Sequence, residues 1–111
     1  MAANFVQDGE ALTFTAPYAV SSGSGFRVGA VFAVALTAAA SGAQVEGRRR
    51  GVWTLTKATG EAWTAYTTVL YWDDTNKRVT STAGSNLKIG VAGTNAASAD
   101  TTGRVVLYPQ V

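Results

Sequence analysis

Apolar and polar residues alternate along much of this chain, which is the pattern of β-strands that bury one face. Leu12 and Phe14 fall on one face of a predicted strand, and the threonines beside them fall on the other. Turn-forming residues such as the SSGSG stretch separate such runs, which recur at residues 28–36, 43–55, 69–72, 87–91 and 104–108. About seven or eight short strands at near-regular spacing predict an all-β fold, either a small barrel or a sandwich.

Residues 28–36 are predicted to form one strand that is apolar on both faces. Phe32 and Val34 lie on one face, while Ala33 and Ala35 lie on the other. A strand buried on both faces belongs in the centre of a fold. A helix through the alanine-rich end of this stretch is the alternative, but its β-branched and aromatic side chains make the helix the second choice.

Three consecutive arginines, Arg48, Arg49 and Arg50, stand out in a chain with little charge. The net charge is +2, and without the triplet six basic residues would stand against seven acidic ones. On a continuous strand over residues 43–55, Arg48 and Arg50 share one face and Arg49 occupies the other. Splitting the charge in this way favours contact with protein over contact with nucleic acid. Ion pairs with an acidic protein partner and a charged edge strand are both open interpretations.

The sequence offers little chemistry for catalysis. It contains no cysteine and no histidine, so thiolate nucleophiles, histidine bases and the usual zinc ligands are missing. The glycine-rich stretch GSGFRVGA lacks the Lys-Ser/Thr pair of a phosphate-binding loop. Asp73 and Asp74 are followed by Lys77 and Arg78, which indicates a hairpin turn rather than a calcium loop. We therefore predict a non-enzymatic protein with no catalytic, cofactor-binding or metal-binding residues.

A low content of charged residues suggests that part of the surface is covered by a partner. Charged residues make up 14% of the chain, against about 25% in an average soluble domain. No hydrophobic run reaches the length of about 20 residues that a membrane helix needs, so we expect no membrane partner. Among the tryptophans, Trp72 is expected in the core and Trp63, between a turn and a strand, at a contact with another protein.

Several segments together resemble a known family. The N-terminal run FVQDGEALTFTAPYAVSSGSGFRVGAVFAVALTAAASGAQVEG is followed in order by KATGEAW, VLYWDDTNKRVT, LKIGVA and GRVVLYP. In this combination the chain resembles the DUF2190 family of phage capsid cement, or decoration, proteins. The resemblance covers nearly the whole chain and implies a small β-rich protein on the outside of an icosahedral head.

The resemblance implies that the major capsid protein is the partner and that the chain bridges neighbouring capsid subunits. We expect one domain over residues 1–111, with residues 1–8 as an N-terminal arm. A homo-oligomer is expected, with dimer and trimer both open, and no nucleic-acid partner. The expected location is the virion exterior, after assembly in the host cytoplasm. The predicted contact residues, with either the capsid or a second copy, are Asn4, Phe5, Val6, Arg48, Arg49, Arg50 and Trp63.

Two other functions remain as alternatives. The chain could instead be a DNA-binding accessory protein of phage recombination, in which case the arginine triplet would contact phosphates. It could also be another structural part of the virion, such as a tail or head-completion subunit. The same β fold without catalytic residues fits that third possibility as well.

Overall fold

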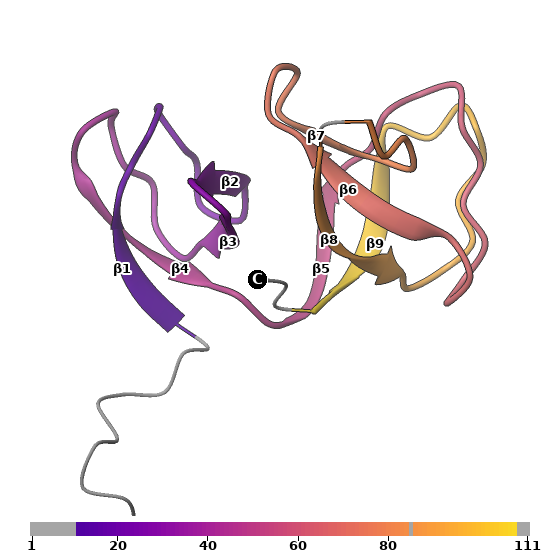
Figure 1. The fold of residues 1–111 in the computed structure, drawn as a ribbon, viewed down its shortest axis with the longest axis horizontal. Coiled ribbons are helices and arrows are strands. Elements are labelled where there is room, and N and C mark those ends of the chain that lie inside the picture. Colours follow the sequence, from indigo (N-terminus) through magenta and orange to yellow (C-terminus); the bar gives the residue numbers. More distant parts are fainter. Residues whose placement is uncertain (1–10, 85, 109–111) are drawn as a thin grey trace, which may run out of the picture.

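The computed structural model of the chain describes residues 11–84 and 86–108, which form nine β-strands in two antiparallel sheets that lie side by side (Figure 1). The all-β prediction is confirmed, because these ranges contain no helix and therefore none long and apolar enough to cross a membrane. The first sheet contains β1 (Ala11–Thr15), β2 (Gly25–Val28), β3 (Val31–Ala35) and β4 (Gln44–Arg48). The second contains β5 (Gly51–Thr56), β6 (Val69–Asp73), β7 (Arg78–Thr80), β8 (Leu87–Ala92) and β9 (Thr102–Leu107).

The first sheet has the strand order β1-β4-β3-β2, and its β2–β3 hairpin corrects one prediction. Residues 28–36 do not form a single strand, because the chain reverses at Gly29 and Ala30 and pairs Val28 with Val31. Only the first of the two turn residues has positive φ, at 60° for Gly29. This is the pattern of a type II′ turn, whose twist matches that of the flanking strands. The prediction that this segment is central is confirmed, since β3 lies inside the sheet.

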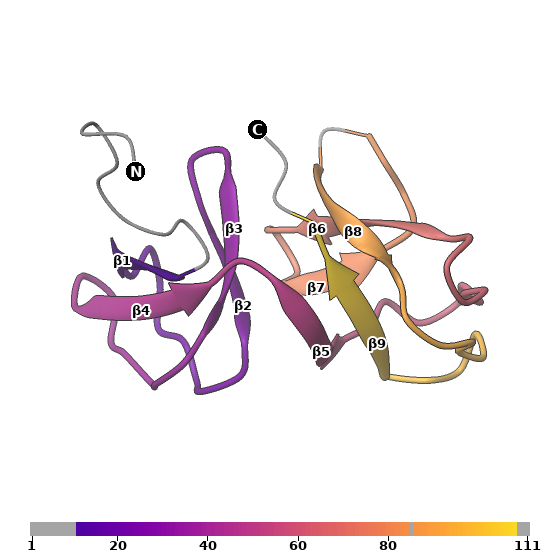
Figure 2. The same ribbon diagram turned by 90° about the horizontal axis from the view of Figure 1, so that it is seen from below.

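A second correction concerns residues 43–55, which form two strands instead of one. β4 ends at Arg48 in the first sheet and β5 begins at Gly51 in the second. The short connection crosses from one sheet to the other (Figure 2). Gly51 has φ of 112°, a conformation that side-chain-bearing residues rarely adopt, so the backbone can leave the plane of the first sheet there.

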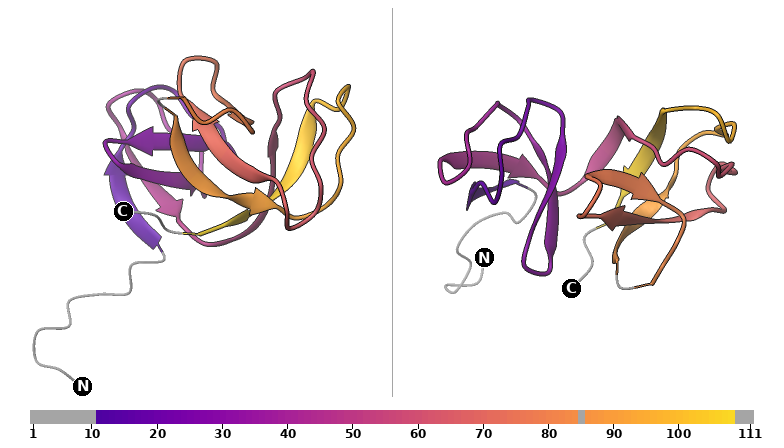
Figure 3. Two further views of the ribbon diagram at one scale, coloured as in Figure 1. Left: turned by 45° about the vertical axis from the view of Figure 1, so that its right-hand side comes forward. Right: turned by 90° about the horizontal axis from the view of Figure 1, so that it is seen from above.

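The second sheet curls until its two edge strands nearly meet. Its strand order is β5-β9-β8-β6-β7, so β5 and β7 are the edges (Figure 3). Just beyond β5, Lys57 forms a parallel bridge with Val79 of β7, and the amide of Ala58 donates to the carbonyl of Val79 at 2.8 Å. With these contacts between its edges, the second sheet forms a small, almost closed barrel.

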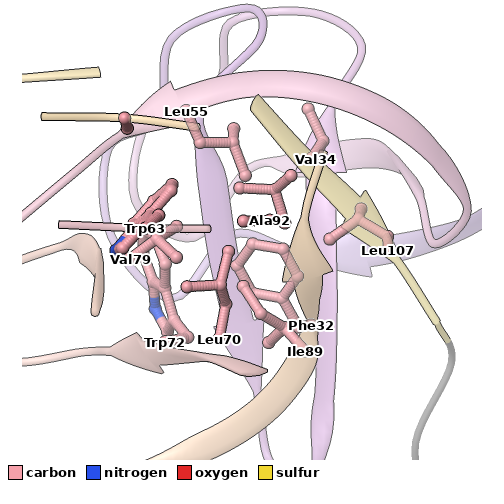
Figure 4. Close-up of a cluster of buried hydrophobic side chains, with 12 residues drawn as sticks. Phe32, Val34, Leu55, Trp63, Leu70, Trp72, Val79, Ile89, Ala92 and Leu107 are labelled. Atoms are coloured by element: carbon pink, nitrogen blue, oxygen red, sulfur yellow. The ribbon is translucent and has the colours of Figure 1, made fainter. Parts of the chain in front are cut away.

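Two hydrophobic cores share the strand β3. Ala33 and Ala35 belong to the smaller core of the first sheet, while Phe32 and Val34 belong to the larger core of the second (Figure 4). The rings of Phe32 and Trp72 lie 5.0 Å apart between centroids. Trp72 is 2% exposed, which confirms its predicted place in the core. The two sheets are therefore joined by packing as well as by the chain.

The acidic stretch after β6 forms the hairpin turn that the sequence predicts. Asp73 accepts hydrogen bonds from the amides of Thr75 and Asn76 at 3.1 and 3.2 Å, and from the Asn76 side chain at 2.9 Å. The hydrogen bond from the Asn76 side chain is the main cause that lowers the pKa of Asp73. The chain then returns as β7, with Trp72 opposite Val79.

Candidate functional site

The arginine triplet lies at the junction between the two sheets, not along one strand. Arg48 is the last residue of β4, is exposed, and pairs with Ala11 and Val34 on either side. Arg49 is half-buried and Arg50 is exposed, both outside any strand. The predicted alternation of the three side chains across two strand faces is wrong, because the strand ends at Arg48. The structure instead presents two exposed guanidinium groups where the chain passes from one sheet to the other.

The junction is held in place by its backbone. The indole Nε1 of Trp53 donates a hydrogen bond to the carbonyl of Arg50 at 2.9 Å. Trp53 packs against the larger core, so this bond ties the junction to the second sheet. The contact uses the backbone carbonyl of Arg50, whose side chain is exposed.

Trp63 lies in the core, contrary to its expected place at a contact with another protein. Only 2% of the residue is exposed. Its backbone pairs with Ala96 in both directions, at 2.9 and 3.0 Å. The ring lies against Gly103, where any side-chain carbon would clash with it. A position between a turn and a strand does not place this ring at the surface, because the backbone there pairs with Ala96 and the ring packs against Gly103.

The other predicted contact residues, Asn4, Phe5 and Val6, lie outside the described residues.

Glu61 in the KATGEAW segment fixes the loop after β5 to β7. One carboxylate oxygen, Oε1, accepts from Trp63 Nε1 at 3.0 Å and from the Ser81 amide at 2.6 Å. The other, Oε2, accepts from the Thr80 hydroxyl at 2.9 Å. Partial burial acts to raise the pKa of Glu61, but these hydrogen bonds outweigh burial and lower the pKa below its ordinary value. The carboxylate is thus a structural acceptor.

Lys57 of the same segment is a buried cation that is satisfied by carbonyl groups. It is 2% exposed, and its Nζ donates to the carbonyls of Ala58 at 3.0 Å and Asp100 at 3.5 Å. The ammonium also lies 5.5 Å from the centroid of the Trp63 ring, within the range of cation–π attraction. Lys57, Glu61 and Trp63 therefore act together to stabilise one end of the barrel.

A cleft between the two sheets has the shape of a binding site, and sequence reasoning missed it. It has a volume of about 330 Å³ and is lined on one side by residues 18–21 and 23–25 and on the other by residues 54–56 of β5. Its walls mix hydroxyl groups, backbone and aromatic rings, with Lys77 as the charged group. Tyr18 and Trp72 come from segments far apart in sequence, so no local motif marks the cleft.

A cluster of hydrogen bonds around Asp74 holds the cleft together. Its Oδ1 accepts from the Tyr18 hydroxyl at 2.8 Å and from Trp72 Nε1 at 3.0 Å, while Lys77 Nζ lies 4.3 Å from the centroid of the Tyr18 ring. Burial, together with the hydrogen bond to Asp74 and its charge, raises the pKa of Tyr18 to about 12. The phenol therefore stays protonated at neutral pH and serves as a donor that links the first sheet to the β6–β7 hairpin.

The groups that line the cleft are hydroxyls, aromatic rings, backbone and the Lys77 amine, which can contact a bound molecule. Histidine and cysteine are absent from the sequence. Across the described residues, no group of three or more acidic, histidine or cysteine side chains lies together as a metal site.

Comparison with known proteins identifies the family. Residues 6–107 match the sequence profile of a family described as phage cement protein. The chain belongs to the phage cement protein family. Membership associates this cement protein with a phage capsid and with a structural rather than a catalytic role. No curated protein and no solved structure matches the chain significantly.

Proposed function

We propose that this cement protein binds the outside of a phage head and stabilises contacts between major capsid protein subunits. The match of residues 6–107 to the phage cement family is the observation that carries the proposal. On this proposal the protein joins the virion exterior after synthesis in the host cytoplasm. It acts as one domain over residues 1–111, with residues 1–8 as an arm whose Asn4, Phe5 and Val6 contact the capsid or a second copy.

The two-sheet architecture supports this role physically. The structure is 46 Å long in its longest dimension and carries two sheets held at a fixed junction. A rigid, elongated body can contact more than one capsid subunit at once. Several weak contacts combine through effective concentration, and a dimer or trimer of the cement protein multiplies them.

The exposed arginines at the junction fit a capsid contact. Arg48, at the end of β4, and Arg50, in the connection between the sheets, are exposed, and guanidinium groups bind carboxylates in a two-point geometry. We propose that they pair with acidic side chains of the major capsid protein. Arg49 is half-buried and lines a small hollow with Phe32 and Tyr108.

The proposal is tested with expanded, undecorated heads of the phage. Wild-type protein is expected to co-sediment with the heads and to raise the temperature at which they break open. Arg48→Glu with Arg50→Glu should weaken binding by about tenfold or more, because it places carboxylates against acidic partners. Arg48→Lys with Arg50→Lys keeps the charge and is the matched control, expected to bind closer to wild type. The proposal is contradicted if the wild-type protein does not bind the heads, or if it binds them and does not raise the temperature at which they break open.

A further inference from the structure

Four valines form a continuous row across the outer face of the second sheet. Val52 of β5 pairs with Val106 of β9, Val106 pairs with Val91 of β8, and Val91 pairs with Val69 of β6. Residues directly opposite one another in an antiparallel sheet project from the same face. With strands about 4.8 Å apart, three spacings make the row about 14 Å long.

The row faces away from the core. The residues that alternate with these valines are buried: Leu70 and Val105 are 0% exposed, and Ala92 is 0% exposed. Val52 is 58% exposed, and the other three valines are half-buried on the same face. Isolated apolar residues on a surface are ordinary, but a continuous row across four strands is the kind of patch that marks an interaction surface.

Unpaired positive charge lies on both sides of the row. Arg104 lies two residues before Val106 on β9, opposite Thr54, and Lys88 lies on β8 opposite Tyr71. Both cations are exposed, and neither side chain makes a hydrogen bond or ion pair with any residue that the structure describes. Asp73, at the end of β6, already pairs with Arg78 at 3.7 Å.

Tyr66 adds an exposed aromatic ring beside the end of the row. Its amide donates to the carbonyl of Ala92 at 2.7 Å, which places its backbone next to the residue that follows Val91. The residue is 74% exposed and has a φ of 59°. A bulky residue at positive φ is strained, and such strain concentrates at functional sites. A rigid, exposed tyrosine is also a common anchor in protein interfaces.

We propose that the valine row binds an extended apolar segment of the major capsid protein that carries carboxylates on both sides. This inference rests on the proposed function and adds the surface and the chemistry of the partner. A second copy of the chain is a poor occupant, because packing this face on itself would bring Arg104 and Lys88 against like charges. A segment of about four extended residues, at about 3.3 Å each, matches the length of the row.

The apolar part of the proposal is tested with Val52→Asp in the full chain, measured by co-sedimentation with undecorated heads over a range of concentrations. The variant should bind about tenfold more weakly or worse, because a charge replaces apolar surface at the contact. Leu36→Asp is the matched control. Leu36 is an aliphatic residue 37% exposed beside the first sheet, outside the row, and its variant should bind like wild type. Circular dichroism and thermal melting establish that both variants are folded.

The charged part is tested with Arg104→Glu combined with Lys88→Glu. Wild-type binding should weaken as salt rises, because ion pairs at an exposed rim are screened. The double variant should bind about tenfold more weakly at low salt and show a smaller salt dependence, of which the part due to Arg48 and Arg50 remains. Sedimentation of each protein without heads gives its oligomeric state alongside this measurement.

The outcomes separate the two proposals. If the wild-type protein does not bind the heads, both the proposed function and the valine-row contact are wrong. If the wild-type protein binds and Val52→Asp binds equally well, only the valine-row contact is wrong. If the wild-type protein is an oligomer in solution and Val52→Asp is not, the face is a contact between copies of the chain. In that case the proposal that a capsid segment occupies the face is wrong.

Discussion

The two sheets of this cement protein are stabilised in different ways. The core cluster of the first sheet contains six buried residues, three of which are alanine, whereas that of the second contains twelve, including two tryptophans. The second sheet also has the Lys57 and Glu61 contacts, and its edges nearly meet. The first sheet instead depends on Phe32 and Val34, which pack into the core of its neighbour. We infer that the second sheet is the rigid body and that the first is stable because it is attached to it.

The largest loss of stability is expected from Phe32→Ala, which removes the ring that joins the two cores. Such a substitution costs about 3–5 kcal/mol in free energy of unfolding. Because Phe32 lies against Trp72, amide hydrogen exchange should accelerate in both sheets. Denaturation followed by circular dichroism gives the free energy, and mass spectrometry of exchanged peptides locates the loss.

Phe26→Ala is the matched control for this comparison. Phe26 is 0% exposed and belongs to the smaller core, where it packs edge-on against Phe14 at 5.3 Å. Its loss should accelerate exchange in the first sheet while leaving β6, β8 and β9 protected. Equal loss of protection in the second sheet in both variants would contradict the division into a rigid sheet and an attached one.

Glu61→Ala is expected to cost about 1.5–3 kcal/mol, because it leaves three donors without their charged acceptor. The pKa of Glu61 is lower in the folded chain than its ordinary value of 4.5. The Glu61 carboxylate therefore stabilises the fold at pH values above 4.5, and this stabilisation is lost as the pH falls through the pKa of the folded state. Between roughly pH 6 and pH 3, the urea concentration at the unfolding midpoint should fall less for Glu61→Gln than for the wild-type protein. Identical acid dependence in the two proteins would show that the carboxylate is not the cause.

A smaller effect is expected from Tyr18→Phe, which removes one hydrogen bond between the first sheet and Asp74. The cost should be about 1 kcal/mol, because Trp72 still donates to the same carboxylate. The pKa of Tyr18 is raised to about 12, above the ordinary 10.0. The wild-type protein should thus lose stability as the pH rises from the ordinary to the raised value, and Tyr18→Phe should lack this component. Denaturation in alkaline buffers measures the difference.

The smallest effect is expected from Arg50→Ala, which should change stability by no more than about 0.5 kcal/mol. The hydrogen bond from Trp53 goes to the Arg50 carbonyl and survives the substitution. Thermal melting checks this expectation. A large loss of stability would mean that the side chain itself holds the two sheets together.

The sequence reveals those features that depend on local pattern. Alternation predicts the strands at Leu12, Leu70 and Val105, and the Asp73 turn is recognisable from its residue types. The turn at Gly29 is hidden because the residues on both sides are apolar, so the pattern shows no interruption. The break at Arg49 is hidden because it has no proline or turn motif, and the alternate positions from Val45 to Trp53 continue through it.

Features that depend on long-range pairing are not visible in the sequence. The valine row exists only because four strands align in a particular register, with residues from Val52 to Val106 brought together. The cleft likewise needs Tyr18 to meet Asp74, 56 residues further on. The burial of Trp63 is not visible in the sequence either, because its neighbours suggest a loop, whereas its ring fits against Gly103 of a distant strand.

The central claim is that this cement protein binds the outside of the capsid through its rigid second sheet. Electron cryomicroscopy of heads incubated with the purified protein tests it most directly. The account predicts added density on the outer surface between capsid subunits, with the valine row turned toward the shell. Density on the inner surface, or heads that remain bare at saturating protein, would contradict it.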